Sequence, residues 1–115
     1  MDIFTKKVLQ TIIKHCNTIE DTRGHFGLEY SDFENNVIYH NALLTPIAQI
    51  GELAKRLSKI FKDKYPEIPW RNITGMRDVL IHKYETIDKA ILWNVSVIEI
   101  PKIKNFCIKK LRDEE

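Results

Sequence analysis

Four residues of one short stretch, Arg77, Asp78, His82 and Tyr84, have side chains suited to phosphodiester chemistry. Histidine titrates near neutral pH, so it can take a proton from a ribose 2′-hydroxyl or give one to a leaving oxygen. Arginine stays charged, grips two phosphate oxygens at once and stabilises charge that develops at phosphorus. RNA carries its own nucleophile, so this chemistry requires no metal or other cofactor. The stretch therefore indicates an RNA-cleaving site.

The spacing of these residues predicts how a continuous helix would orient them. At about 100° per residue, Arg77 and Tyr84 differ in direction by roughly 20°, whereas His82 lies roughly 140° from Arg77. Asp78 and His82 are an i, i+4 pair, so the carboxylate can orient the imidazole. One helix does not aim Arg77 and His82 at the same atom. We therefore expect a nearby loop, or the same segment of a second subunit, to complete the site.

A purely structural role is the alternative for the same residues. His82 could be a core histidine whose hydrogen bond is satisfied by Asp78, and Arg77 could belong to a surface ion pair. Spacing alone does not separate this interpretation from the catalytic one. Surface or core positions are also expected for the remaining histidines, which are His15, His25 and His40.

Apolar residues recur at helical spacing along the chain, and only four glycines and four prolines interrupt it. The pattern predicts a first helix from Asp2 to about Asp21, followed by a loop over 23–27. Ser31 and Glu34 form a capping-box pattern, which predicts that a second helical stretch begins there. The sequence thus opens with two helices joined by a loop.

Pro46 lies within the second stretch, whose apolar pattern continues to Ile60, and must either kink one long helix or separate two shorter ones. A third helix is predicted from Trp70 to about Tyr84, so it would carry the whole polar stretch. A fourth begins at Asp88 and a last one at Pro101. The expected fold class is all-α: an antiparallel bundle of four to five helices in a single domain over residues 1–115.

Composition excludes several protein classes. Hydrophobic residues make up 43% of the chain and charged residues 30%, as in soluble globular proteins. No apolar run is long enough to cross a membrane, and the N-terminus lacks the pattern of a signal peptide, so we expect a cytoplasmic protein. Cys16 and Cys107 are too few and too far apart for a disulfide framework or a zinc site, and are expected to be buried. Lysine-rich stretches at 55–64 and 102–112 are either solvated helix faces or contacts for nucleic acid.

The polar stretch resembles a known motif. Arg77-x4-His82-x-Tyr84 is similar to the R-x4-H-x-Y motif of HepT toxins, which belong to the HEPN superfamily of ribonucleases, and Asp78 fits the polar position after the arginine. The resemblance covers nearly the whole chain and is most specific over 68–93. Further similar stretches lie at 50–52, 70–77, 84–88 and 92–93.

This resemblance implies a helical homodimer in which two motifs meet in a cleft and cleave RNA without a metal. It implies catalytic roles for Arg77 and His82, a supporting role for Asp78, and for Glu52 either a place near the cleft or a structural ion pair. HepT-like toxins are commonly paired with MntA, a small nucleotidyltransferase antitoxin that transfers AMP from ATP to the motif tyrosine, here Tyr84. The expected function is the toxin of such a type VII-like (HEPN/MNT) toxin–antitoxin system.

Two other functions remain open. The chain could be a non-catalytic helical module that docks a nucleotidyltransferase and presents that enzyme's substrate to it. It could also be a plain helical interaction protein whose polar stretch is structural. A docking surface needs neither His82 nor Arg77, so the residue types favour the enzyme.

Overall fold

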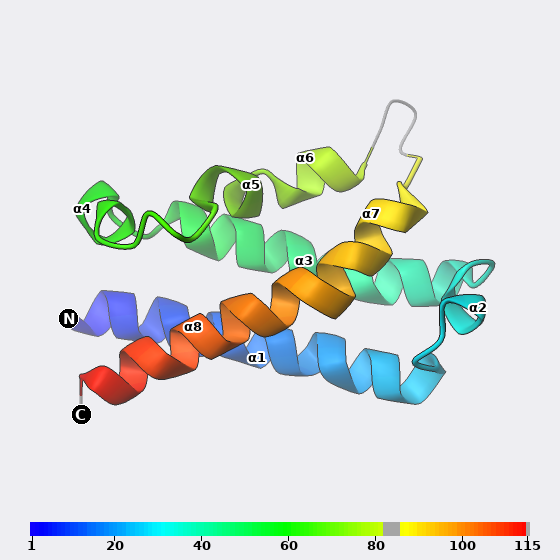
Figure 1. The fold of residues 1–115 in the computed structure, drawn as a ribbon, viewed down its shortest axis with the longest axis horizontal. Coiled ribbons are helices and arrows are strands. Elements are labelled where there is room, and N and C mark those ends of the chain that lie inside the picture. The colour runs from blue at the N-terminus through cyan, green and yellow to red at the C-terminus, as the bar shows by residue number, and fades with distance from the viewer. Residues whose placement is uncertain (82–85, 115) are drawn as a thin grey trace.

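Helix α1 (Ile3–Phe26) and helix α3 (Val37–Lys55) pack against each other at the centre of the molecule. The structure is a computed structural model that describes residues 1–81 and 86–114. Figure 1 shows α3 between α1 on one side and the short helices α5 and α6 on the other. The chain is an all-α bundle, as the apolar spacing predicts.

Helix α1 begins at an Asp2 cap and ends before Gly27. The Asp2 carboxylate accepts a hydrogen bond from the Thr5 amide at 2.6 Å, which satisfies one of the free amides of the first turn. Gly27 has a φ of 128°, a conformation that side chains disfavour. The predicted loop over 23–27 is wrong, because Phe26 remains helical and stacks on the buried Tyr39 at 5.0 Å between ring centroids.

The second stretch divides at points other than those predicted. Helix α2 (Tyr30–Phe33) begins after Glu29, whose amide donates to the Asp32 carboxylate at 3.1 Å, and not at Ser31. Helix α3 follows with Asn36 as its cap. Pro46 lies inside α3 and does not end it. The division comes later instead, at the Ser58 cap of helix α4 (Lys59–Asp63).

In place of the predicted third helix the structure has two short helices, and the second of them ends earlier than expected. Helix α5 (Trp70–Thr74) and helix α6 (Met76–Leu80) meet at Gly75. The backbone is extended at Ile81, which forms an isolated antiparallel bridge with Ile87. The expectation that one helix runs from Trp70 to Tyr84 is therefore wrong, because the chain breaks at Gly75 and Ile81 pairs with Ile87 in place of continuing the helix.

The C-terminal part forms one long helical rod. Helix α7 (Lys89–Asn94) begins after the predicted Asp88, continues into the π-helical turn η2 (Val95–Glu99), and passes without a loop into helix α8 (Ile100–Asp113). Figure 1 shows this rod crossing the bundle toward the C-terminus. Pro101 lies in the first turn of α8, directly after this π-helical turn, and has no amide proton to donate to the carbonyls of η2.

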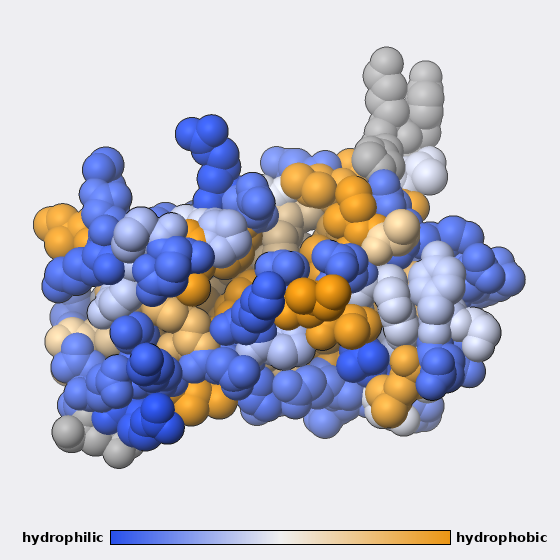
Figure 2. Space-filling view, viewed as in Figure 1, coloured by the Kyte–Doolittle hydropathy of each residue, from blue (hydrophilic) through white to orange (hydrophobic). Residues whose placement is uncertain are grey.

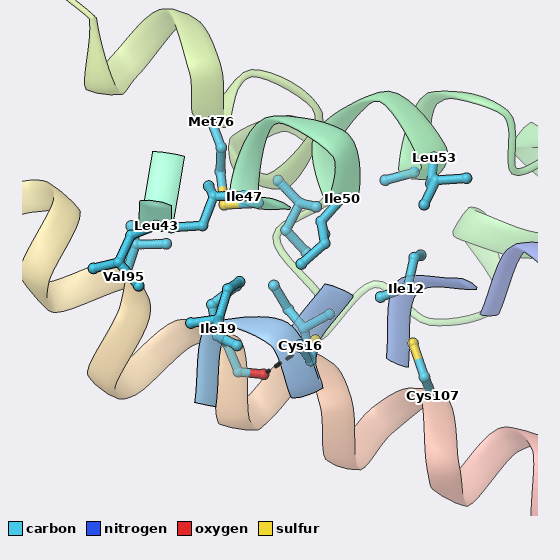
Figure 3. Close-up of a cluster of buried hydrophobic side chains, with 14 of the residues drawn as sticks. Ile12, Cys16, Ile19, Leu43, Ile47, Ile50, Leu53, Met76, Val95 and Cys107 are labelled. Atoms are coloured by element: carbon cyan, nitrogen blue, oxygen red, sulfur yellow. Dashed lines mark hydrogen bonds between the residues drawn. The ribbon is translucent and has the colours of Figure 1, made fainter. Parts of the chain in front are cut away.

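Figure 3 shows core side chains from α1, α3, α6, η2 and α8, and the core also includes Phe33 of α2, Ile73 of α5 and Leu92 of α7. Cys16 and Cys107 lie within it as free thiols with 0% and 1% exposure, which confirms the prediction that both are buried. Burial raises the pKa of each thiol to about 12. Across the described ranges, every helix is too short or too polar to cross a membrane.

Candidate functional site

Helix α6 presents Arg77 and Asp78 to solvent. Its neighbours Met76 and Leu80, one before and three after Arg77, are buried in the core and anchor the helix. In α5, Ile73 is buried at the matching helical spacing. The apolar spacing therefore fixes which side of α6 faces inward and leaves the two charged side chains exposed.

The turn between α5 and α6 is held against α3 by a close backbone approach. A β-carbon at Gly51 would lie 3.0 Å from the Ile73 carbonyl oxygen and 3.5 Å from that of Thr74. Only glycine allows α3 this close to the turn that leads into Arg77. The spacing of apolar residues does not predict this contact. The only indication in the sequence was the similarity of residues 50–52 to the HepT pattern.

The end of α6 overturns the single-helix geometry expected for the motif. The Ile81 amide still donates to the Arg77 carbonyl at 3.0 Å, but Ile81 itself is extended. Helix α6 thus ends at Leu80, and the predicted relations of Asp78 to His82 and of Arg77 to Tyr84 depend on residues beyond that end. His82 and Tyr84 both lie outside the described residues.

Glu52 lies on α3 and pairs with Lys55, whose ammonium is 3.0 Å from its carboxylate. Both side chains are more than half exposed, and such pairs contribute at most about 1 kcal/mol to stability. Within residues 1–81 and 86–114, no ion pair joins Arg77 to Asp78 or to Glu52. A role for Glu52 near the cleft stays a prediction.

An apolar hollow of about 530 Å³ lies between α5–α6 and α7–η2. Val79 and Leu80 line it from α6, and Ile91 and Val95 from the opposite rod, whereas Arg77 and Asp78 do not. Val79 is 49% exposed, and Figure 2 shows hydrophobic side chains gathered in this part of the surface. The hollow is thus an apolar surface beside the charged side chains of α6 and not a pocket around them.

Two other histidines, His40 and His25, have structural surroundings. His40 is buried, and its Nε2 lies 2.7 Å from the Phe33 carbonyl oxygen. His25 is exposed with its ring edge-on to Phe26. These positions match the expected core and surface roles. In the part of the chain that the structure describes, no three His, Cys, Asp or Glu side chains group closely enough to hold a metal ion.

Comparisons with known proteins agree on one family. Residues 7–109 match the model of the family described as "Ribonuclease HepT-like". The chain is 35% identical to "Putative RNase MJ1380" of Methanocaldococcus jannaschii over 86% of this chain and 89% of that protein. It is 41% identical to "Probable ribonuclease HepT" of Thermococcus cleftensis over 86% and 88%, respectively. It is 32% identical to "Putative RNase TTE0752" of Caldanaerobacter subterraneus over 93% and 94%. No solved structure gives a significant match.

Proposed function

Because this chain belongs to the HepT-like ribonuclease family, we propose that it is an endoribonuclease whose catalytic residues are Arg77 and His82. The observation that carries the proposal is the placement of Arg77. Its side chain is exposed on a short helix that buried Met76 and Leu80 anchor, five residues before His82 in the sequence. Such a cation can receive a phosphate without rearrangement of the core.

The proposed reaction uses the nucleophile of the RNA itself. The 2′-oxygen attacks the adjacent phosphorus, and the bond from phosphorus to the 5′-oxygen of the next nucleotide breaks. His82 acts in proton transfer between the attacking hydroxyl and the leaving oxygen. Arg77 holds the phosphate and stabilises the charge on its oxygens. The products are a 2′,3′-cyclic phosphate and a 5′-hydroxyl, and no metal takes part.

We propose that the active form is a homodimer. Val79 and Ile98 expose 49% and 45% of their surface, and Val79 borders the apolar hollow. Exposed apolar side chains beside a hollow are features that a subunit interface covers. The resemblance of the motif to HEPN proteins also supports two copies, each contributing one motif to the cleft.

The proposed regulator is a MntA-like nucleotidyltransferase that transfers AMP from ATP to Tyr84. Tyr84 is two residues after His82 in the sequence. Addition of AMP there would place a bulky anion next to the proposed phosphate site, where it would compete with RNA for Arg77. In this account the chain is the toxin, and the nucleotidyltransferase is the antitoxin of a type VII-like pair.

Expression without a partner, combined with an RNA cleavage assay, separates the enzyme from a docking module. The proposal expects growth arrest and degradation of cellular RNA when the chain is expressed alone, and neither effect with His82→Ala. A non-catalytic module that only presents a substrate to a nucleotidyltransferase would leave growth and RNA unchanged. That result would overturn the proposed function.

A further inference from the structure

Positive charge is concentrated in two stretches of the chain. Residues 55–64 contain five basic side chains and one acidic one, and residues 102–112 contain five basic side chains and no acidic one. The two stretches together carry a net charge of +9, whereas the whole chain carries +2, so the remaining residues carry −7. Such an uneven distribution gives a protein a positive region that attracts polyanions.

Packing of aromatic rings brings these two stretches together. Phe61 and Tyr65 lie against Phe106 of α8, with ring centroids 6.4 Å and 5.2 Å from that of Phe106. The Lys110 ammonium lies 4.4 Å from the centroid of the Tyr65 ring. Figure 1 shows α4 and the C-terminal turns of α8 at the same end of the molecule, and Figure 2 shows hydrophilic side chains over those turns. Two stretches far apart in the sequence thus form one basic surface.

Acidic side chains neutralise part of this surface. Three of its lysines form ion pairs: Lys55 with Glu52 at 3.0 Å, Lys59 with Asp63 at 2.7 Å, and Lys104 with Glu20 at 2.9 Å. Two more border hollows that acidic side chains also line: Lys64 with Asp2 and Glu114, and Lys102 with Glu67 and Glu99. These five lysines are therefore poorly placed to bind another anion.

Lys62, Lys109 and Lys110 are the unneutralised lysines closest in sequence to the ring contacts. Within residues 1–81 and 86–114, none of the three forms an ion pair. Lys62 directly follows Phe61, and the other two lie one turn after Phe106. Lys109 is exposed, whereas Lys62 and Lys110 are half-buried. Both helices thus contribute cations beside the rings that join them.

Helical geometry separates Lys62 from Lys64. Phe61 and Tyr65 face α8, and at about 100° per residue the two lysines lie roughly 80° to either side of that edge. Lys64 borders the hollow with the acidic lining, and Lys62 does not. Two lysines of one short segment therefore have different electrostatic surroundings.

We propose that Lys62, Lys109 and Lys110 form a second contact surface for RNA, which binds phosphates of the strand outside the cleavage site. This inference rests on the proposed function, which makes RNA the polyanion that the surface meets. Lysine ammoniums bind phosphates as point charges, and each contact releases condensed counterions. The Lys110 ammonium covers the Tyr65 ring, so that ring does not stack on a base. Binding here is therefore independent of base sequence and weakens with salt.

Binding of a 2′-O-methyl RNA oligonucleotide tests the surface without cleavage, because this RNA lacks the attacking hydroxyl. The variant Lys62→Gln/Lys109→Gln is compared with Lys64→Gln/Lys14→Gln, which removes the same charge and includes the exposed Lys14 of α1. Fluorescence anisotropy over a series of salt concentrations gives Kd. We expect the first variant to raise Kd about tenfold, at about threefold per lysine. The steepness of the dependence of log Kd on log salt should fall by about 1.4. The control should change Kd less than about twofold.

Cleavage provides a second readout. A dinucleotide contains a single phosphodiester, which the cleavage site itself occupies, whereas a long RNA also reaches α4 and α8. The ratio of kcat/KM for the long RNA to kcat/KM for the dinucleotide should therefore fall about tenfold in Lys62→Gln/Lys109→Gln, mainly through a higher KM for the long RNA. The same ratio should stay near the wild-type value in Lys64→Gln/Lys14→Gln.

Three results would overturn the inference. One is an unchanged Kd in Lys62→Gln/Lys109→Gln, and another is an equal loss in the control, which would assign the effect to net charge alone. The third is unchanged RNA binding together with lost binding of a nucleotidyltransferase, which would make the surface a protein interface. If the wild type cleaves no RNA, the proposed function fails, while the binding of 2′-O-methyl RNA still shows whether the surface holds a phosphate strand.

Discussion

The backbone of Gly51 in α3 lies so close to Ile73 that a β-carbon at position 51 would stand 3.0 Å from the Ile73 carbonyl oxygen. That oxygen belongs to the backbone of α5, one turn before Arg77, and cannot move without shifting the helix. The contact makes the position of α6 depend on the absence of a single methyl group in α3.

Gly51→Ala should therefore destabilise the protein although alanine favours helices. The gain in helix propensity is about 1 kcal/mol, and overpacking against backbone costs about 1–3 kcal/mol, so a net loss is expected. Gly24→Ala is the control, because no heavy atom other than those of its chain neighbours and its own helix backbone lies within 4 Å of the added carbon, and it should increase stability. Urea-induced unfolding measures the free energy of unfolding of both variants. Stabilisation by Gly51→Ala would show that the close approach is not a constraint.

Val79→Glu should weaken the proposed homodimer without unfolding the subunit. Val79 is 49% exposed, so a charged side chain can be solvated in the monomer but not in an apolar interface. Ile60→Glu is the control, since Ile60 is 74% exposed on α4. Light scattering coupled to gel filtration should give a dimer for the wild type and Ile60→Glu, and a monomer for Val79→Glu. A dimer in all three would place the interface elsewhere.

Mixtures of two inactive variants test whether subunits share a site. If Arg77 of one subunit acts with His82 of the other, a heterodimer of Arg77→Ala and His82→Ala contains one intact pair. After the two inactive homodimers are mixed and re-equilibrated, each heterodimer should have up to about half of the activity of a wild-type dimer. Absence of any recovery, despite heterodimer formation detected by mass spectrometry, would contradict a shared site.

Tyr84→Phe should cleave RNA but escape control by a nucleotidyltransferase. Phenylalanine lacks the hydroxyl that would accept AMP, and proton transfer is assigned to His82. Incubation with the partner enzyme and ATP should add the mass of AMP to the wild type and to the control Tyr30→Phe, but not to Tyr84→Phe. Addition of AMP to Tyr84→Phe would move the modification site to another residue.

The features predicted well from sequence are those that depend on neighbouring residues. Asp88 caps α7 as expected because the cap and its amide partner are three residues apart. Buried Cys16 and Cys107 follow from apolar spacing. The all-α class follows from the same periodicity along most of the chain.

The errors come from contacts between residues that spacing does not connect. Helix α1 continues to Phe26 because that ring stacks on Tyr39, and α6 ends at Leu80 where Ile81 pairs with Ile87. The residue types of the site were readable from Arg77 and His82. Two supports of α6 were not readable: the close approach of Gly51 and the bond from the Asp88 amide to the Leu80 carbonyl. Both exist only once the helices are packed.

The nature of the RNA ends tests the central claim most directly. Purified protein is incubated with a defined RNA in the presence of a chelator, and the products are analysed by mass spectrometry, with His82→Ala as the matched variant. The account predicts 2′,3′-cyclic phosphate and 5′-hydroxyl ends from the wild type and no cleavage by a folded His82→Ala protein. Cleavage that requires a divalent metal, or equal cleavage by His82→Ala, would contradict it.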